Sequence, residues 1–295
     1  MTASPEVPTG TIYDIGYRHY DGPRLGRRGA VTAIVGAGLR AVFGLGRSGR
    51  SKILPWGVVV LGLAPAVIAV AIRVLVGEIG ELYNYENYLW GIGALMPIFV
   101  AAQAPELVVN DIRQRVLPLY FSRPIGRFDY AAAKFASLAL GLLALTLLPL
   151  LVLFLGRVLA AEDVLGALGD EAGWLPAIFG SGIIHAVALA GLGLAVSSLA
   201  ARRAYAAGAV LAVFLVGGVV SAIFASPGIG FEGLAPFLNP LAILDGAREW
   251  LFGGTVIESP VASSGMPLWV YGIATLVLVL ASWAVLALRY QRIPT

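Results

Sequence analysis

The sequence predicts an all-α membrane protein with six transmembrane helices, an interfacial helix before them and both termini in the cytoplasm. Three observations predict this fold. Of the 295 residues, 59% are hydrophobic and 13% are charged, whereas a soluble domain carries about 25% charged residues because water must wet its surface. The apolar residues gather in runs long enough to cross a bilayer. The basic residues gather in alternate connections between these runs.

The first 54 residues are expected to stay on the cytoplasmic side. Residues 1–28 contain no apolar stretch of the kind that a cleavable signal peptide has. Residues 29–54 are predicted to form an amphipathic elbow helix in the membrane interface, with Arg40 and Arg47 opposite its apolar face. The apolar face consists of Val31, Ile34, Val35, Val42 and Leu45. An ordinary solvated helix is the alternative.

Residues 55–289 are predicted to form the transmembrane domain. Its six spans are Trp56–Val76, Leu89–Val108, Tyr130–Leu155, Trp174–Leu199, Tyr205–Ala225 and Leu268–Leu288. Tryptophan or tyrosine stands near several span ends, where an amphipathic ring suits the lipid headgroups. The third and fourth spans exceed the thickness of the hydrocarbon, so we expect them to be tilted or broken at one end.

The distribution of lysine and arginine predicts the orientation. With a cytoplasmic N-terminus, only Arg73, Arg157 and Arg248 of the 20 basic residues fall on the outer side. The outer connections are instead acidic, and a tail of residues 290–295 lies inside. Because positive residues are retained in the cytoplasm, both termini are predicted to be inside.

Two connections are too patterned to be simple linkers. Residues 106–130 form a cytoplasmic loop with apolar and charged pieces. Residues 226–266 form an outer loop that is rich in proline and glycine but still contains apolar residues. Since a free loop does not need apolar residues, short helices that return to the membrane are predicted in this outer loop.

One glycine-rich segment imitates a phosphate-binding loop. Gly44–Ser51 matches G-x-G-x-x-G and nearly matches G-x-x-x-x-G-K-S, with Arg50 in place of lysine. Both motifs need a preceding strand, but an amphipathic helix precedes this segment and a membrane span follows it. We therefore expect no nucleotide site in this chain. We also expect no cofactor, no metal and no nucleic-acid partner, and the chain has no cysteine to offer as a thiolate ligand.

A serine and a histidine in the fourth span suggest an intramembrane enzyme as one alternative. Ser181 lies one turn before His185, and ionisable groups within spans are functional candidates. No aspartate or glutamate lies in the interior of a predicted span to orient the histidine. A packed or pore-facing His185 is therefore the favoured interpretation, and no catalytic residue is predicted.

The cytoplasmic loop is the most specific feature of the chain. The second span is predicted to continue as a charged helix that stops before Pro118. The apolar residues Leu119–Phe121 follow, with an exposed tyrosine and phenylalanine, and then a turn at Arg123. Asp129 is a plausible N-cap of the third span. The acidic pair Asp111 and Asp129 and the exposed aromatic residues favour docking of a soluble protein over simple contact with lipid headgroups.

The loop resembles a known family signature. The run DIRQRVLPLYFSRPIGRFDYAAAK (Asp111–Lys134) resembles the segment between the second and third spans of bacterial ABC-2 type permeases, the membrane subunits of ATP-binding-cassette exporters. The opening run YDIGYRHYDGPRLGR (Tyr13–Arg27) is similar to a segment of such permeases in high-GC bacteria. The sequence departs from the family at Pro118, where a small residue is common, which puts the detailed geometry of the coupling helix in doubt.

The resemblance implies a permease subunit of the bacterial cytoplasmic membrane that moves a substrate by alternating access. ATP and Mg²⁺ would bind a separate cytosolic ATPase subunit, and the permease would pair with a second copy or a related permease among the membrane lipids. The implied ATPase contacts are Glu106, Asp111, Arg113, Arg115, Tyr120, Arg123, Arg127 and Asp129. A similar complex for metallocentre maturation or for mechanical or assembly work is the alternative.

Overall fold

The computed structural model describes Gly22 and residues 25–76, 84–114, 116–122, 124–254 and 260–292, and all regular elements in these ranges are helices. They are α1 (Gly26–Val42), α2 (Gly49–Val76), α3 (Tyr85–Gly91), α4 (Leu95–Arg113), α5 (Leu117–Phe121), α6 (Arg127–Leu159), α7 (Val164–Ala172), α8 (Leu175–Leu199), α9 (Arg203–Phe224), η1 (Ala235–Leu238), α10 (Pro240–Phe252), α11 (Pro260–Ser263) and α12 (Trp269–Gln291). Helices α2, α4, α6, α8, α9 and α12 are long and apolar enough to cross a membrane. The predicted all-α fold with six spans is confirmed.

The third and fourth spans, expected to be tilted or broken at one end, are not broken, and the break in the bundle falls in the second span. Helices α6 and α8 are continuous, and the 33 residues of α6 extend over about 50 Å at 1.5 Å per residue. The second span is instead divided into α3 and α4 by residues 92–94. Pro97 has no N–H to donate to the carbonyl of Gly93, and glycine is itself a weak helix former, so the helix is interrupted here.

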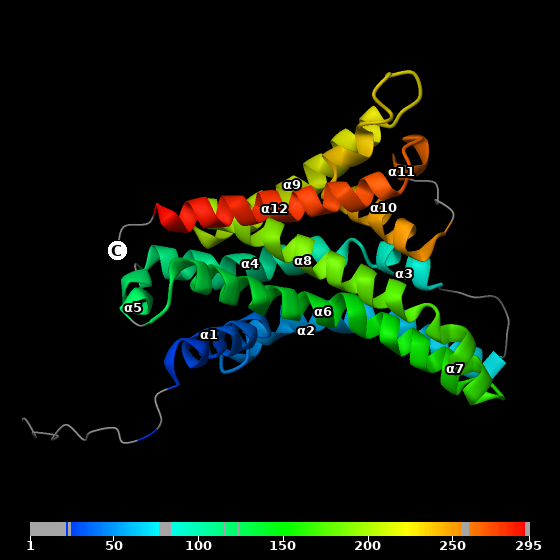
Figure 1. Cartoon of the computed structure of the whole chain (residues 1–295), viewed down its shortest axis with the longest axis horizontal. Coiled ribbons are helices and arrows are strands. Elements are labelled where there is room, and N and C mark those ends of the chain that lie inside the picture. The colour runs from blue at the N-terminus through cyan, green and yellow to red at the C-terminus, as the bar shows by residue number, and fades with distance from the viewer. Residues whose placement is uncertain are drawn as a thin grey trace, which may run out of the picture.

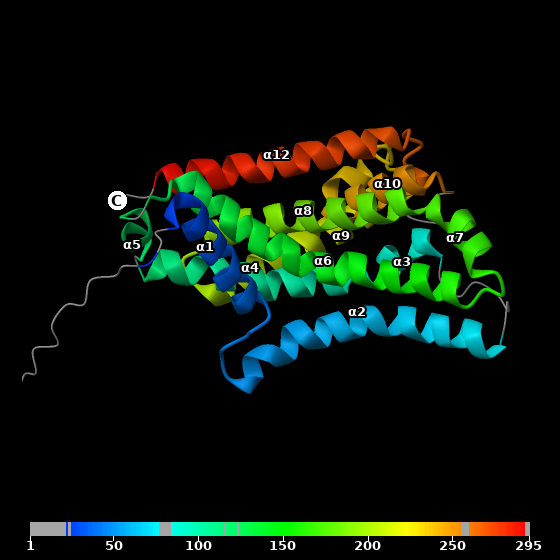
Figure 2. The same cartoon turned by 60° about the horizontal axis from the view of Figure 1, so that its bottom comes forward.

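The hydroxyl of a tyrosine from α3 forms hydrogen bonds with two backbone groups of α2. The Tyr88 hydroxyl donates to the carbonyl of Gly62 at 2.5 Å and accepts from the N–H of Ala66 at 3.2 Å. These are the two groups that an uninterrupted helix would join to each other. Pro65 lies between them, and Figure 2 shows α2 as a curved helix at the edge of the bundle. The inserted hydroxyl satisfies both backbone groups where the helix is distorted.

The helices lie in a bundle with two distinct ends (Figure 1). We call the end with α1, α5 and the end of α12 the elbow end, and the end with α3, α7, α10 and α11 the far end. Helices α4, α6 and α8 are mostly buried in the centre, whereas α2, α9 and α12 expose most of their apolar surface. Exposed apolar faces on outer helices are what a lipid environment allows.

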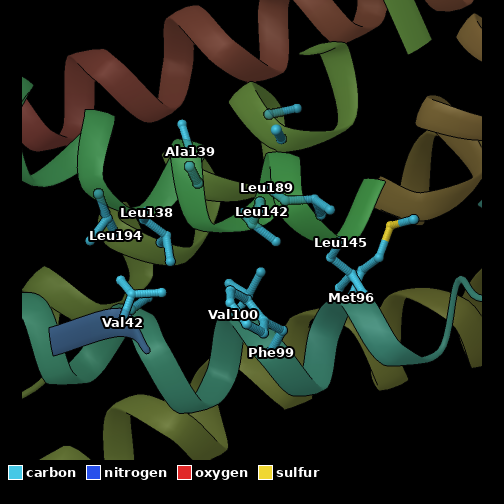
Figure 3. Close-up of a cluster of buried hydrophobic side chains, with 14 of the residues drawn as sticks. Val42, Met96, Phe99, Val100, Leu138, Ala139, Leu142, Leu145, Leu189 and Leu194 are labelled. Atoms are coloured by element: carbon cyan, nitrogen blue, oxygen red, sulfur yellow. The ribbon is translucent and has the colours of Figure 1, made fainter. Parts of the chain in front are cut away.

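The centre of the bundle is filled by aliphatic and aromatic side chains from four helices. Figure 3 shows Phe99 and Val100 of α4 facing Leu142 of α6 and Leu189 of α8. Val42 at the end of α1 completes the cluster, and all of these side chains are buried. The elbow helix is therefore part of the packed core and does not simply rest on it.

The elbow helix is shorter than predicted. It ends at Val42, and a turn with Gly44 and Gly46 at positive φ separates it from α2, which begins at Gly49. Two left-handed glycines cannot continue a right-handed helix, so the predicted single helix over 29–54 is wrong. Its apolar face packs against α6 and α4, with Ile34 and Val42 buried.

The connection between the last two spans contains the short helices that its apolar residues predict. These are η1, α10 and α11. Helix α10 packs against α12, α8, α9 and α3 at the far end, and the side chain of Asn239 accepts the N–H of Leu241 at its start. The connection is thus a structured part of the bundle.

A matched pair of glycines tests how closely α1 packs on α6. A Cβ added to Gly38 would lie 2.7 Å from the Cβ of Ser137, whereas one added to Gly36 would meet nothing within 4 Å. We expect Gly38→Ala to destabilise the protein by about 1–3 kcal/mol through overpacking. Gly36→Ala should be neutral or stabilising because alanine is the better helix former.

The measurement is the thermal unfolding midpoint of each purified variant in the same detergent. The predicted packing requires a lower midpoint for Gly38→Ala than for Gly36→Ala. Equal midpoints would show that α1 is not tightly docked on α6.

Candidate functional site

The segment that joins α4 to α6 forms a compact projection at the elbow end. We call residues 114–126, which carry α5, the α5 knob. Figure 1 places α5 at the tip of the molecule, beyond the ends of α4 and α6. Leu117 is buried and anchors the start of α5, while Pro118 is exposed.

Aromatic rings form the base of the knob. The buried ring of Tyr130 lies 5.4 Å from the ring of Tyr120 and 5.4 Å from that of Tyr290. Phe121 meets the same ring edge-on at 6.2 Å. Because these residues come from α5, α6 and α12, the cluster fixes the knob to two transmembrane helices. Tyr120 and Phe121, expected to be exposed, are half-buried in this base.

The first acidic residue of the signature is bonded within the chain. Asp111 accepts a hydrogen bond from the Tyr130 hydroxyl at 2.5 Å and pairs with the ammonium of Lys134 at 2.8 Å. That ammonium also lies 5.3 Å from the centre of the Tyr130 ring. These contacts link the end of α4 to the first turns of α6. Charge-assisted hydrogen bonds of this kind are among the stronger ones in proteins.

The second acidic residue of the signature, Asp129, bonds both the start of α6 and the start of α1. Asp129 accepts the N–H of Gly126 at 2.9 Å, so it stands in the first turn of α6 and Gly126, not Asp129, is the N-cap. Its two carboxylate oxygens also accept hydrogen bonds from Arg27 at 2.6 and 2.8 Å. A carboxylate in the first turn suits the positive end of the helix dipole. The forked contact ties the first turn of α1 to the start of α6.

Arg127 joins the knob to the end of the last span. Its Nη1 donates to the carbonyl of Gln291 at 2.6 Å, and its guanidinium lies 5.9 Å from the centre of the Phe121 ring. Helix ends leave carbonyls without intrahelical partners, and arginine satisfies one of them here. This contact connects α6 to α12.

Glu106 is buried within the chain. Its carboxylate pairs with Arg47, from the turn after α1, and with Arg203 at 2.5 Å, from the first residue of α9. The two arginine side chains are about half exposed, so they shield the carboxylate from the solvent. One acidic residue of α4 therefore holds the elbow turn and α9 together.

A cavity of about 440 Å³ lies between α1 and these charged residues. The wall from α1 consists of small side chains, among them Ala30, Ala33 and Ala37. The opposite wall is polar. It contains Arg47, Glu106, Asn110, Asp111, Gln114, Tyr120 and Lys134. Two of the predicted acidic contact residues, Glu106 and Asp111, therefore line this cavity.

The exposed surface of the elbow end is formed by residues other than these paired carboxylates. The side chains of Leu119 and Phe128 are 69% and 66% exposed. Arg113 is exposed at the end of α4. The predicted contacts Arg115 and Arg123 lie outside the residues that the structure describes. Of the predicted set, Glu106, Asp111, Arg127 and Asp129 are thus engaged inside the chain, and Arg113 is exposed.

Two other motifs from the sequence have plain structural roles. The Ser181 hydroxyl donates to the carbonyl of Ile178 at 3.1 Å, and Nδ1 of His185 donates to the carbonyl of Ser181 at 2.8 Å. The histidine therefore bonds the backbone of Ser181 and not its hydroxyl, which is not the nucleophile–base arrangement. Gly44–Ser51 follows α1 and runs into α2, so a helix and not a strand precedes it.

Comparisons with known proteins do not place this chain in a family. No protein-family model matches it, and no curated protein matches it.

The pairing of Asp111 with Lys134 is testable by substitution. Lys134→Met keeps the length of the side chain but leaves the Asp111 carboxylate without its cation. We expect a loss of about 1–3 kcal/mol, the cost of removing one partner of a charged and mostly buried hydrogen bond. Lys52→Met is the control, because Lys52 is exposed at the start of α2.

The measurement is the unfolding midpoint of Lys134→Met, of Asp111→Asn, of the double variant that carries both changes, and of the control Lys52→Met. A double variant less destabilised than the sum of the two single variants demonstrates the coupling. Additive effects would contradict it.

Proposed function

We propose that this chain is the membrane-spanning subunit of an ABC-2 type exporter, and that its α5 knob docks a separate cytosolic ATPase subunit. The elbow end would then face the cytoplasm of a bacterial cell. The six apolar helices would move a substrate by alternating access. ATP and Mg²⁺ would be held by the partner, in keeping with the resemblance of Asp111–Lys134 to the permease signature.

The single observation that carries the proposal is a short helix held outside the bundle on a rigid base. Helix α5 is tied to α4, α6 and α12 through Tyr130, Asp111 and Arg127. A flexible loop would absorb a push from a partner, whereas a bonded knob passes it to three transmembrane helices. Rigid coupling of this kind is what a subunit driven from outside requires.

The charge of the elbow end supports the same orientation. The exposed basic residues described on this end are Arg27, Arg28, Arg40, Arg47, Arg50, Lys52, Arg113, Arg202, Arg203 and Arg292. Exposed residues at the far end of α6 and along α7 include Glu162, Asp163 and Asp170. Since lysine and arginine are retained in the cytoplasm, the elbow end is the cytoplasmic one in this proposal.

The proposal assigns the residues of the signature to two roles. Glu106, Asp111, Arg127 and Asp129 would transmit movement, because their charged groups are bound inside the chain. Contact with the ATPase would come from exposed groups such as Leu119 and Arg113. An apolar side chain within a charged surround is a common anchor in transient interfaces.

The test replaces the exposed leucine of the knob. We expect Leu119→Glu to release the ATPase and to abolish membrane-stimulated ATP turnover, since a carboxylate would be buried in the interface. The fold should survive because the side chain is 69% exposed. Leu165→Glu is the matched control, being 81% exposed on a short helix at the opposite end.

The measurement is co-purification from the native membrane, with the partner identified by its own phosphate-binding motif, and the rate of ATP hydrolysis by the complex. Loss of both in Leu119→Glu but not in Leu165→Glu supports the docking site. A complex that survives Leu119→Glu with unchanged turnover would overturn it.

A further inference from the structure

A second charged cluster lies at the far end, on α10. Arg248 is 1% exposed and Glu249 is 3% exposed, and Asp245 stands one turn before them. The helix is held between α12, α8, α9 and α3, and Figure 1 shows it at the opposite end of the molecule from the knob. The three charges belong to neither the α5 knob nor its network.

The pairing within this cluster is incomplete. Nε of Arg248 lies 3.6 Å from Oδ1 of Asp245, and its Nη2 lies 3.4 Å from Oε1 of Glu249. Both distances are long for hydrogen bonds. Nε and Nη1 of Arg248 and Oε2 of Glu249 have no hydrogen-bond partner among the described residues. A buried guanidinium and a buried carboxylate with unused hydrogen-bonding groups are costly to keep in the fold.

Negative charge exceeds positive charge in the cluster. Asp245 and Glu249 share one arginine, and Glu86 from α3 adds a third carboxylate that acts electrostatically on Glu249. The Glu86 carboxylate reaches the end of α10, since a Cβ added to Gly254 would lie 2.6 Å from its Oε2. The single positive charge of Arg248 can neutralise only one of these three carboxylates.

Among the described residues, the parts of the other elements packed on α10 that lie at the far end bring no further cation, since Arg203 of α9 and Arg289 of α12 stand at the elbow end of those helices. Helix α8 brings His185, which lies within electrostatic range of Arg248, and α12 brings Tyr271 beside Glu249. Neither η1 nor α11 contains a titratable residue, and the far half of α9 contains none. The surplus carboxyl group is therefore neutralised at least cost by a proton.

The electrostatics of the two carboxyl groups agree with this geometry. Burial raises the pKa of Glu249 to about 7, against the opposing effect of Arg248. Burial likewise raises the pKa of Asp245 to about 6. A carboxyl group that is exposed to water keeps a pKa near 4. The packed position of α10 thus binds a proton more tightly than a position in which these groups meet water.

We propose that Asp245, Arg248 and Glu249, with Glu86 beside them, form a proton-binding site, and that the bound proton holds α10 in its packed position. The direction of the pH dependence follows from the linkage between proton binding and the packing of α10. Whichever position binds the proton more tightly gains stability as the pH falls. The contribution of the proton to the packing of α10 is therefore largest in mild acid and is lost as the pH rises through about 7. The site responds to the medium at the far end and does not depend on the proposed ATPase.

Amide hydrogen exchange of the intact chain in a detergent micelle tests the proposal. The readout is protection of a peptide covering residues 240–252 at pH 5.5 and at pH 7.5, corrected for the intrinsic exchange rates. Protection should be lower at pH 7.5 by on the order of tenfold, because one bound proton changes an opening equilibrium by up to about tenfold per pH unit.

Neutral isosteres provide the decisive comparison. Glu249→Gln removes the surplus negative charge. In this variant, the protection of residues 240–252 should be the same at both pH values and close to the protection that the wild type has at pH 5.5. Asp245→Asn should flatten the profile in the same way. Asp170→Asn removes an exposed carboxylate on α7 and should leave the wild-type profile unchanged.

Three outcomes would overturn the proposal. They are equal protection of the wild type at both pH values, protection that rises with pH, and a pH dependence that persists in both Glu249→Gln and Asp245→Asn.

Discussion

Charged groups beside hydrocarbon are tolerated only when other charges or hydrogen bonds neutralise them, and the elbow end is organised around this constraint. Glu106, Asp111 and Asp129 each meet a cation from another part of the chain. Each pairing joins two elements that are distant in the sequence. Together they join the elbow turn and the knob to the ends of the spans at the elbow end.

This arrangement connects the knob firmly to several helices of the bundle. Arg27 and Asp129 connect it to α1, and Arg127 connects it to α12. Displacement of α5 would disturb its ring contacts with Tyr130 and Arg127, which are themselves bonded to α4 and α12. In the proposed exporter, the signature residues are thus the linkage and not the surface of contact.

Much of the fold is readable from the sequence because hydropathy reports directly on lipid exposure. The six spans agree with the predicted ranges to within a few residues at most ends, and the larger differences are at the start of α2 and at both ends of α4. The interruption before α4 had a local signal in Gly93 and Pro97. The end of α1 had one in Gly44 and Gly46. Each signal is only a pair of residues beside apolar residues that themselves favour a continuous helix.

The site was harder to predict because its contacts are non-local. Arg27 and Asp129 are 102 residues apart, and no periodicity links them. The aromatic pair Tyr120 and Phe121 looks exposed in sequence because only the fold brings Tyr130 and Tyr290 beside it. The far-end cluster has a local signal, since Asp245, Arg248 and Glu249 follow the spacing of one helix face. Its burial, which gives it its chemistry, depends on α8, α12 and α3.

The central claim is that the charged signature is an internal linkage and that other residues of the knob meet the partner. Electron cryomicroscopy of this chain bound to its ATPase tests the claim most directly. The account predicts that Asp111 remains on Lys134 and Asp129 on Arg27, while the ATPase surface covers Leu119. Carboxylates turned outward onto the ATPase, or an ATPase bound away from α5, would contradict it.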